Sequence, residues 1–417
     1  MWLSKLVGLT LFGLGGSFVA PLEHPAINYY KGPVDNPAVR LNRRLASGQT
    51  KLAFDPQFGY LPAVLKELQV SRESQILVFS KTSFQAPRIA PRTPRALYYN
   101  DTLSVGYVQG GDVVELAVHD PKQGVIFYSL DQDEIGYPRL ERRDACLQCH
   151  QSGATLGIPG IVVRSVSAEH NGMPAFQHGT YVSDHRSDFK ERWGGWYVTG
   201  DTGAMKHMGN AVTKNRDSAE LVPIPNRFDP AQYLTPHSDV VSLIVLEHQT
   251  HMTNLLTRAG FEIRHALHHQ DAMNEIFKDP AGYRSESTLR RIRQAAEELV
   301  DYMLFVEESP LPNPIKGSSR FTETFAAQGP RDRQGRSLRQ FDLQTRIFRY
   351  PLSYMVYSEA FDQLPVPLRV SAVERLRSIL DGQIVEPQYR HLTPTVRRDV
   401  LSILAATKPD LFAPAKR

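Results

Sequence analysis

The chain has 417 residues, with 48 lysines and arginines against 44 aspartates and glutamates, which gives a formal net charge of +4. Of all residues 41% are hydrophobic and 22% are charged, which is typical of a folded protein long enough for two or three domains. Basic and acidic residues are mixed throughout, so we expect no nucleic-acid-binding stripe. With two cysteines in the whole chain, the core does not depend on a disulfide framework.

Residues 1–20 have the pattern of an export signal. A lysine at position 5 is followed by an uncharged apolar run from Leu6 to Ala20, which is typical of a secretory signal peptide. Ser17 and Ala20 are small enough to precede a cleavage site, whereas Pro21 is unfavourable directly after one. The segment is therefore either a signal peptide or an uncleaved membrane anchor, and in both cases we expect an exported, periplasmic protein.

Residues 21–71 are expected to form an extended arm and a short helix. The arm, up to about residue 55, is rich in Pro, Asn and Arg and shows no apolar periodicity. The helix is predicted over residues 60–70, where apolar side chains recur at helical spacing.

Residues 72–140 are predicted to form a β-rich domain. Short runs of β-branched and aromatic residues, between 72 and 131, are separated by turn sequences such as Asn100-Asp101 and Gly110-Gly111-Asp112. Such alternation of strands and turns favours a small antiparallel sheet.

The C-terminal half is predicted to be mostly helical. In residues 236–309, Ser238 or Asp239 caps a helix with one buried face, and a second helix follows over 285–308. Residues 310–339 are expected to be a polar, mobile linker. Residues 340–417 contain two amphipathic helices with clear start and stop signals, at 367–380 and 394–406. The predicted fold class is therefore α+β.

The central region, residues 141–235, contains the sequence Cys146-Leu147-Gln148-Cys149-His150. C-x-x-C-H is the attachment pattern for a c-type haem: two thiols add to the two vinyl groups of the porphyrin, and the adjacent imidazole becomes an axial ligand of the iron. Both cysteines of the chain lie in this motif, and in bacteria such attachment takes place outside the cytoplasm. We therefore predict one covalent haem c, bound through Cys146 and Cys149, with His150 as the proximal iron ligand.

Other chemistry is compatible with two cysteines at this spacing. The pair could be a thioredoxin-like redox site, half of a zinc site or a simple disulfide. Zinc would need two further ligands, and no second pair of cysteines supplies them.

After the motif we expect two strands, at 161–166 and 176–182, joined as a hairpin through Asn171-Gly172. Trp193 and Trp196 then form an aromatic cluster that either lines one side of a porphyrin or belongs to the core. Residues 200–210 form a glycine-bearing loop.

At Cys146 to His150 the chain resembles the c-type cytochromes. With the segments 91–132 and 350–380 included, it resembles a group of large exported bacterial proteins that carry a single such motif and have no assigned reaction. The resemblance implies thioether links at Cys146 and Cys149, proximal ligation by His150 and electron transfer as the default role. Strands after the motif depart from the mostly helical fold of a small cytochrome c.

The sixth iron ligand decides the mechanism, because Met or His there closes the iron for electron transfer and an open position lets small molecules bind. Met208 follows His150 at a separation similar to that in small cytochromes and is our tentative distal ligand. Met173, in a Met-Pro-Ala-Phe segment, and His207 are weaker candidates.

His248 is the alternative distal ligand. It lies within an apolar helical stripe, where a lone histidine more often belongs to the core, but it is not the only polar candidate on this helix. His251 lies one turn further along, and Glu247 precedes it by four residues, where a carboxylate could orient its ring. These three residues are the only, and weak, candidates for catalysis.

Two hypotheses follow. The first is an exported monohaem c-type cytochrome that passes electrons to and from redox partner proteins. The second is a haem oxidoreductase, peroxidase-like or oxygenase-like, in which the helix at 239–269 builds a distal pocket for a small molecule; a chain much longer than a simple carrier favours it. A sensor without turnover is a third, weaker hypothesis. The membrane is involved only through an uncleaved N-terminal anchor.

Overall fold

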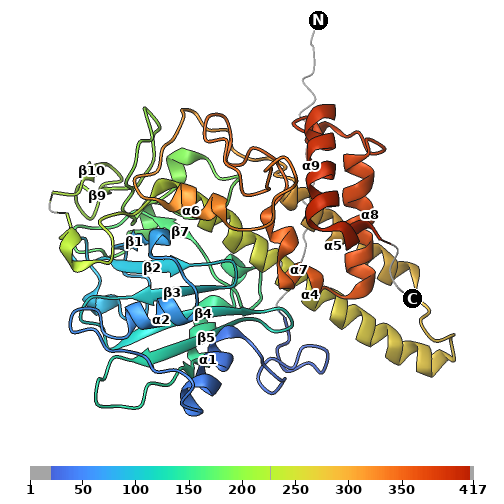
Figure 1. Cartoon of the computed structure of the whole chain (residues 1–417), viewed down its shortest axis with the longest axis horizontal. Helices are drawn as coiled ribbons and strands as arrows, with labels where there is room; N and C mark the ends of the chain where they lie inside the picture. Colours follow the sequence, from blue (N-terminus) through green and yellow to red (C-terminus); the bar gives the residue numbers. More distant parts are fainter. Residues whose placement is uncertain (1–19, 226, 414–417) are drawn as a thin grey trace, which may run out of the picture.

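The computed structural model describes residues 20–225 and 227–413. It confirms the predicted α+β class: an antiparallel sheet is built from the N-terminal third, and helices dominate the C-terminal half (Figure 1). The expected signal peptide or anchor lies outside the described residues, except for Ala20. Within the described ranges, no helix combines the length and the apolar character that crossing a bilayer requires.

The predicted sheet is present, and its strands are paired in sequence order with antiparallel neighbours throughout. Alternation along β4 explains its two faces, because Val114, Leu116 and Val118 are buried whereas Glu115 and Ala117 between them are half-buried. The strands are β1 (Ile76–Val78), β2 (Arg95–Tyr99), β3 (Leu103–Tyr107), β4 (Val113–Asp120), β5 (Gly124–Asp131) and β6 (Glu141–Arg142).

The N-terminal arm is more ordered than its sequence suggests. Helix α1 (Pro37–Ala46) occupies part of the segment that we expected to be extended, so that prediction is wrong there. The Asn36 side chain accepts from the Val39 N–H, and Pro37 occupies the first turn, which together favour a helix start. The predicted short helix is confirmed as α2 (Leu61–Glu67), and both helices pack on the more apolar face of the sheet (Figure 1).

The central region is made of short elements. The predicted hairpin is present, because β7 (Arg164–Val166) pairs antiparallel with β8 (Thr180–Val182). Its strands are shorter than expected, and residues 176–178 form a 3-10 turn rather than strand. The remaining elements are α3 (Leu147–His150), β9 (Ala211–Thr213) and β10 (Leu221–Pro223).

Helix α4 (Val240–Phe277) passes between the sheet and the C-terminal helices (Figure 1). Asp239 caps it, as predicted, by accepting from the N–H groups of Val241 and Ser242. Its first half is buried on nearly every side, so both layers of the molecule pack against it. The helices after it are α5 (Glu286–Met303), α6 (Phe321–Ala327), α7 (Glu359–Asp362), α8 (Val366–Leu380) and α9 (Pro394–Thr407).

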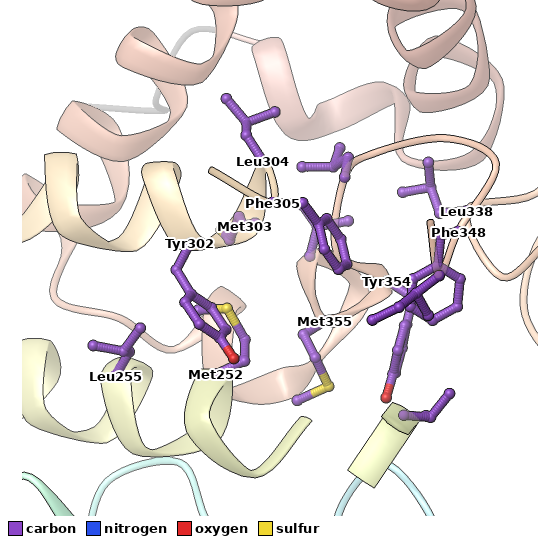
Figure 2. Packing of buried hydrophobic residues seen from close by; sticks show 14 of the residues in the cluster. Met252, Leu255, Tyr302, Met303, Leu304, Phe305, Leu338, Phe348, Tyr354 and Met355 are labelled. Carbon is purple, nitrogen blue, oxygen red and sulfur yellow. The ribbon is translucent and has the colours of Figure 1, made fainter. Parts of the chain in front are cut away.

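The segment predicted as a mobile polar linker is instead packed on the core. Phe321 and Phe325 of α6 and Leu338 after it are buried in the same hydrophobic cluster as α4. Figure 2 shows part of that cluster, in which Tyr302 lies in the last turn of α5, Phe305 follows the end of that helix, and Phe348 and Tyr354 belong to the later segment. The polar composition of this segment concealed a few apolar anchors that are enough to fix it.

Candidate functional site

The predicted attachment motif is fixed to the edge strand of the sheet. Strand β6 pairs with β5 through Tyr128 and Arg142, and the chain then turns directly into a 3-10 turn at 144–146 and helix α3. Leu147 is buried, Cys146 is half-buried and Cys149 is exposed. The buried Leu147 side chain thus anchors α3, and the two thiols lie beside the sheet.

The imidazole of His150 is held in one orientation. Its Nδ1 lies 2.9 Å from the carbonyl oxygen of Gly160, and since a carbonyl can only accept, Nδ1 carries the proton. The ring also contacts the ring of Phe127, with a centroid separation of 4.6 Å. Burial lowers the pKa of His150, so the ring is neutral and Nε2 offers a lone pair, the state in which imidazole binds a metal.

The carbonyl that orients His150 is itself held by helix α4. Gly160 N–H donates to the carbonyl of His150 at 3.0 Å, which closes a small ring between the two residues. The carboxamide of Asn254 accepts from the Ile161 N–H at 3.2 Å and donates to the Ile161 carbonyl at 2.7 Å. The loop after the motif is therefore clamped to the central helix.

The two thiols are free, and their environment differs from that of a redox-active pair. Burial raises the pKa of Cys146, and the Glu115 carboxylate raises it further. A catalytic redox cysteine needs the opposite, a thiolate stabilised by positive charge. Across the described ranges, no group of three or more His, Cys, Asp or Glu side chains is arranged to hold a metal ion.

The sheet face beside the motif carries several small side chains. Phe127 of β5 pairs with Ala117 of β4, which pairs with Ser104 of β3, and the next pair on this face is Glu115 with Gly106. Ala117, Ser104 and Glu115 are half-buried, although they belong to the central strands. A planar group attached to α3 would lie against these small residues.

The structure places Met208 in a buried, partly polar environment. Its backbone N–H donates to the Arg192 carbonyl at 3.0 Å, and its sulfur accepts from the Ser165 hydroxyl at 3.7 Å. Among the weaker candidates, the His207 ring packs on Trp193, and Met173 is 47% exposed at its turn. Of the two methionines, Met208 is the one that is buried and whose sulfur is held by a hydrogen bond.

The histidines of α4 are occupied by a polar network inside the core. His248 is fully buried, with Nδ1 2.8 Å from His185 Nδ1 and Nε2 2.8 Å from the Ser353 hydroxyl. Its ring stacks on those of Tyr302 and Phe305, at centroid separations of 5.3 and 4.4 Å, and Figure 2 labels both of these aromatic residues. Both ring nitrogens are therefore engaged, and neither is free for a metal or a substrate.

The predicted pairing of Glu247 with His251 is wrong. Glu247 instead forms a fully buried ion pair with Arg192, at 2.9 Å. The carboxylate beside His251 belongs to Asp184, 3.6 Å away, which also binds Arg186. Glu247 and His251 do lie one turn apart on α4, but Arg192 and Asp184, from a segment far away in sequence, are their charged partners.

The sequence did not single out several of these residues. Gly160 and Asn254 carried no signal as site residues, because their hydrogen-bond partners lie on other elements. Glu115 carried one: it is a charge within the apolar run Val113 to Val118, a position where an alternating strand leaves one face polar.

A separate surface cleft lies elsewhere in the described structure. It has a volume of about 660 Å³ between α1, α2 and the turn after β2, and it is lined by Arg40, Arg43, Arg44 and other polar residues. None of the predicted site residues lines it. Comparison of the chain with protein-family models, with curated proteins and with solved structures found no match, so the geometry around His150 is what bears on function.

Proposed function

We propose that the protein is an exported monohaem c-type cytochrome that carries electrons. The observation that supports it best is the hydrogen bond from His150 Nδ1 to the Gly160 carbonyl. It selects the tautomer whose Nε2 can bind iron, directly after two unoxidised cysteines.

The residues fit the chemistry of haem attachment. Each thiol adds across one vinyl group: a C–S bond forms, the thiol hydrogen goes to the other vinyl carbon and the C=C double bond becomes single. No oxidant is consumed, but both cysteines must be reduced. Cys149 is exposed and Cys146 is half-buried, so both can be reached before the pocket is filled.

The chain's own residues would then position the bound group. His150 provides the proximal nitrogen, and Phe127 beneath its ring limits rotation. Ala117 and Ser104 are small residues on the adjoining sheet face. When bound, haem supplies a one-electron centre whose potential depends on its ligands and on the surrounding charges.

The geometry supports the carrier over the pocket enzyme. The groups proposed for acid–base catalysis, Glu247, His248 and His251, bind Arg192, His185, Ser353 and Asp184. A general acid or base must reach a substrate, whereas these three side chains are already bound to other residues of the chain. Met208, with its sulfur held by Ser165, is the sixth ligand that we propose, and a redox protein is the partner.

The proposal is tested by producing the full chain with its export segment in a bacterium that matures c-type cytochromes. Haem that survives denaturing electrophoresis, together with a mass increase of one haem, is expected for the wild type. The variant C146S/C149S should lose both signals. If the exported wild type carries no covalent haem, the proposal is wrong.

A further inference from the structure

Arg95 and Glu115 form an ion pair on the sheet face beside the attachment motif. Arg95 lies in β2 and Glu115 in β4, and their side chains are only 22% and 20% exposed. Burying two charges costs free energy that their mutual attraction often fails to recover. An ion pair that is buried to this extent on a face of small residues is therefore expected to have a function beyond stabilising the fold.

The strand between them is shaped around the arginine. Gly106 of β3 lies between the two, in register with Glu115. A Cβ at this position would overlap the Arg95 guanidinium. The guanidinium thus lies flat over the strand, on the side that faces the motif.

The pair is not fully satisfied. In the part of the chain that the structure describes, the buried Nε of Arg95 has no hydrogen-bond partner, whereas Glu115 Oε2 lies 2.5 Å from Arg95 Nη2. Ser83 donates to the other carboxylate oxygen at 3.3 Å. A buried polar atom without a partner is costly, and an incoming polar group would relieve that cost.

The pair is close enough to act on the motif. Glu115 lies on the same sheet face as Ala117, which pairs with Phe127, and the Phe127 and His150 ring centroids are 4.6 Å apart, so both charges of the ion pair lie beside the motif. Any charged or redox-active group held by Cys146 and His150 would feel the same two charges.

We propose that Arg95 binds a propionate carboxylate of the attached haem while Glu115 positions the guanidinium, so that the pair sets the reduction potential. This inference rests on the proposed function. A guanidinium is the side chain best suited to a carboxylate, because its planar N–H fork matches the two oxygens. The propionates are the anionic groups of a macrocycle that is otherwise apolar.

Electrostatics fixes the sign of each expected change. A positive charge near the iron disfavours the ferric form, so Arg95→Gln should lower the midpoint potential. Removal of the negative charge in Glu115→Gln should raise it. Arg95→Lys keeps the charge but loses the fork, so its potential should lie between those of Arg95→Gln and the wild type.

The experiment is potentiometric titration of the full haem-loaded protein, after covalent haem has been measured in each variant. The matched control is Arg346→Gln, since Arg346 is 20% exposed and paired with Glu308 away from the motif; its potential should equal that of the wild type. Opposite shifts in Arg95→Gln and Glu115→Gln support the inference.

If both variants carry haem and neither shifts more than the control, or both shift in the same direction, the inference is overturned and the proposed function stands. If Arg95→Gln does not fold, the near-isosteric Glu115→Gln decides alone: a rise supports the inference and an unchanged potential overturns it. A wild type without covalent haem overturns both proposals.

Discussion

The carboxamide of Asn254 holds both backbone polar groups of Ile161, with Oδ1 3.2 Å from the N–H and Nδ2 2.7 Å from the carbonyl oxygen. The residue before Ile161 is Gly160, whose carbonyl accepts from His150. Helix α4 thereby reaches the imidazole through one amide side chain and one turn of loop. The orientation of the proposed iron ligand therefore depends on a residue about a hundred positions away.

Asn254→Leu should loosen that orientation. Leucine removes both hydrogen bonds and leaves two backbone groups unsatisfied, which we expect to lower the free energy of unfolding by about 1–3 kcal/mol. It should also weaken the coordination of iron by His150, seen as a spectral change at low pH in the haem-loaded protein. Urea unfolding and visible spectroscopy measure the two effects.

The control for this variant is Asn274→Leu, on the same helix, where the side chain donates to the Tyr283 carbonyl far from the motif. It should cost stability without altering the haem spectrum. Identical spectra for the two variants would show that Asn254 does not act on His150.

The sequence pattern was sufficient to predict a helix or strand where the residues of that element, and those directly next to it, determine its structure. The sheet over 72–131 and the helix capped by Asp239 were predicted because turn and cap chemistry lies next to each element, and the helix over 285–308 because its apolar residues recur at helical spacing. Helix α1 was missed because its buried residues, Ala38, Leu41 and Leu45, are few among arginines. A narrow apolar face is a weak signal in a basic, Pro-rich context.

The sequence could suggest a candidate site only where its residues are neighbours in the chain. Cys146, Cys149 and His150 form one short motif, and their types alone indicate the chemistry. Glu247 and His251 were expected to pair because they are one turn apart, yet Arg192 and Asp184 bind them instead. Tertiary packing supplied stronger partners from a loop, and no spacing rule within α4 could reveal them.

Met208→Ala should change the spin state of the ferric haem. We expect the wild type to be six-coordinate and low-spin, and loss of the sulfur to open the sixth position, so that carbon monoxide binds the ferrous variant. Visible and electron paramagnetic resonance spectra report the change. His248→Gln should leave them as in the wild type, because both nitrogens of His248 are used within the core.

Met205→Ala is the matched control for Met208, since both methionines are buried in the same loop. Each truncation should cost about 2–5 kcal/mol of stability, and only the change at Met208 should alter the spectra. A low-spin Met208→Ala protein that excludes carbon monoxide would assign the sixth position to another residue.

The two thiols should differ in reactivity before haem is attached. Burial raises the pKa of Cys146, and Cys149 is exposed. In chain produced without residues 1–20, the proposed export segment, iodoacetamide at pH 7 should therefore modify Cys149 first, and the rate at Cys146 should rise at alkaline pH. Mass spectrometry of the peptides follows both. Faster reaction of Cys146 at neutral pH would favour the thiol redox alternative.

The buried pair of Glu247 and Arg192 should leave a signature in the pH dependence of stability. Burial raises the pKa of Glu247 to about 7, against the opposing effect of Arg192. The folded state then holds this proton more tightly than the unfolded chain. The stability that Glu247 contributes is fully present below about pH 4.5 and is lost as the pH rises through 7.

The neighbouring histidines act in the opposite sense. Burial lowers the pKa of His248 to about 3 and that of His251 to about 4, so their contribution is present above pH 6.5 and is lost on acidification. Between pH 7 and 4.5 the gain in stability from Glu247 and the loss from the two histidines partly cancel in the wild type.

Glu247→Gln removes only the contribution of Glu247, so the urea midpoint of this variant should fall more steeply from pH 7 to 4.5 than that of the wild type. Glu286→Gln, at a side chain 71% exposed, should follow the wild-type slope, and an equally shallow slope for Glu247→Gln would mean that Glu247 stays ionised throughout.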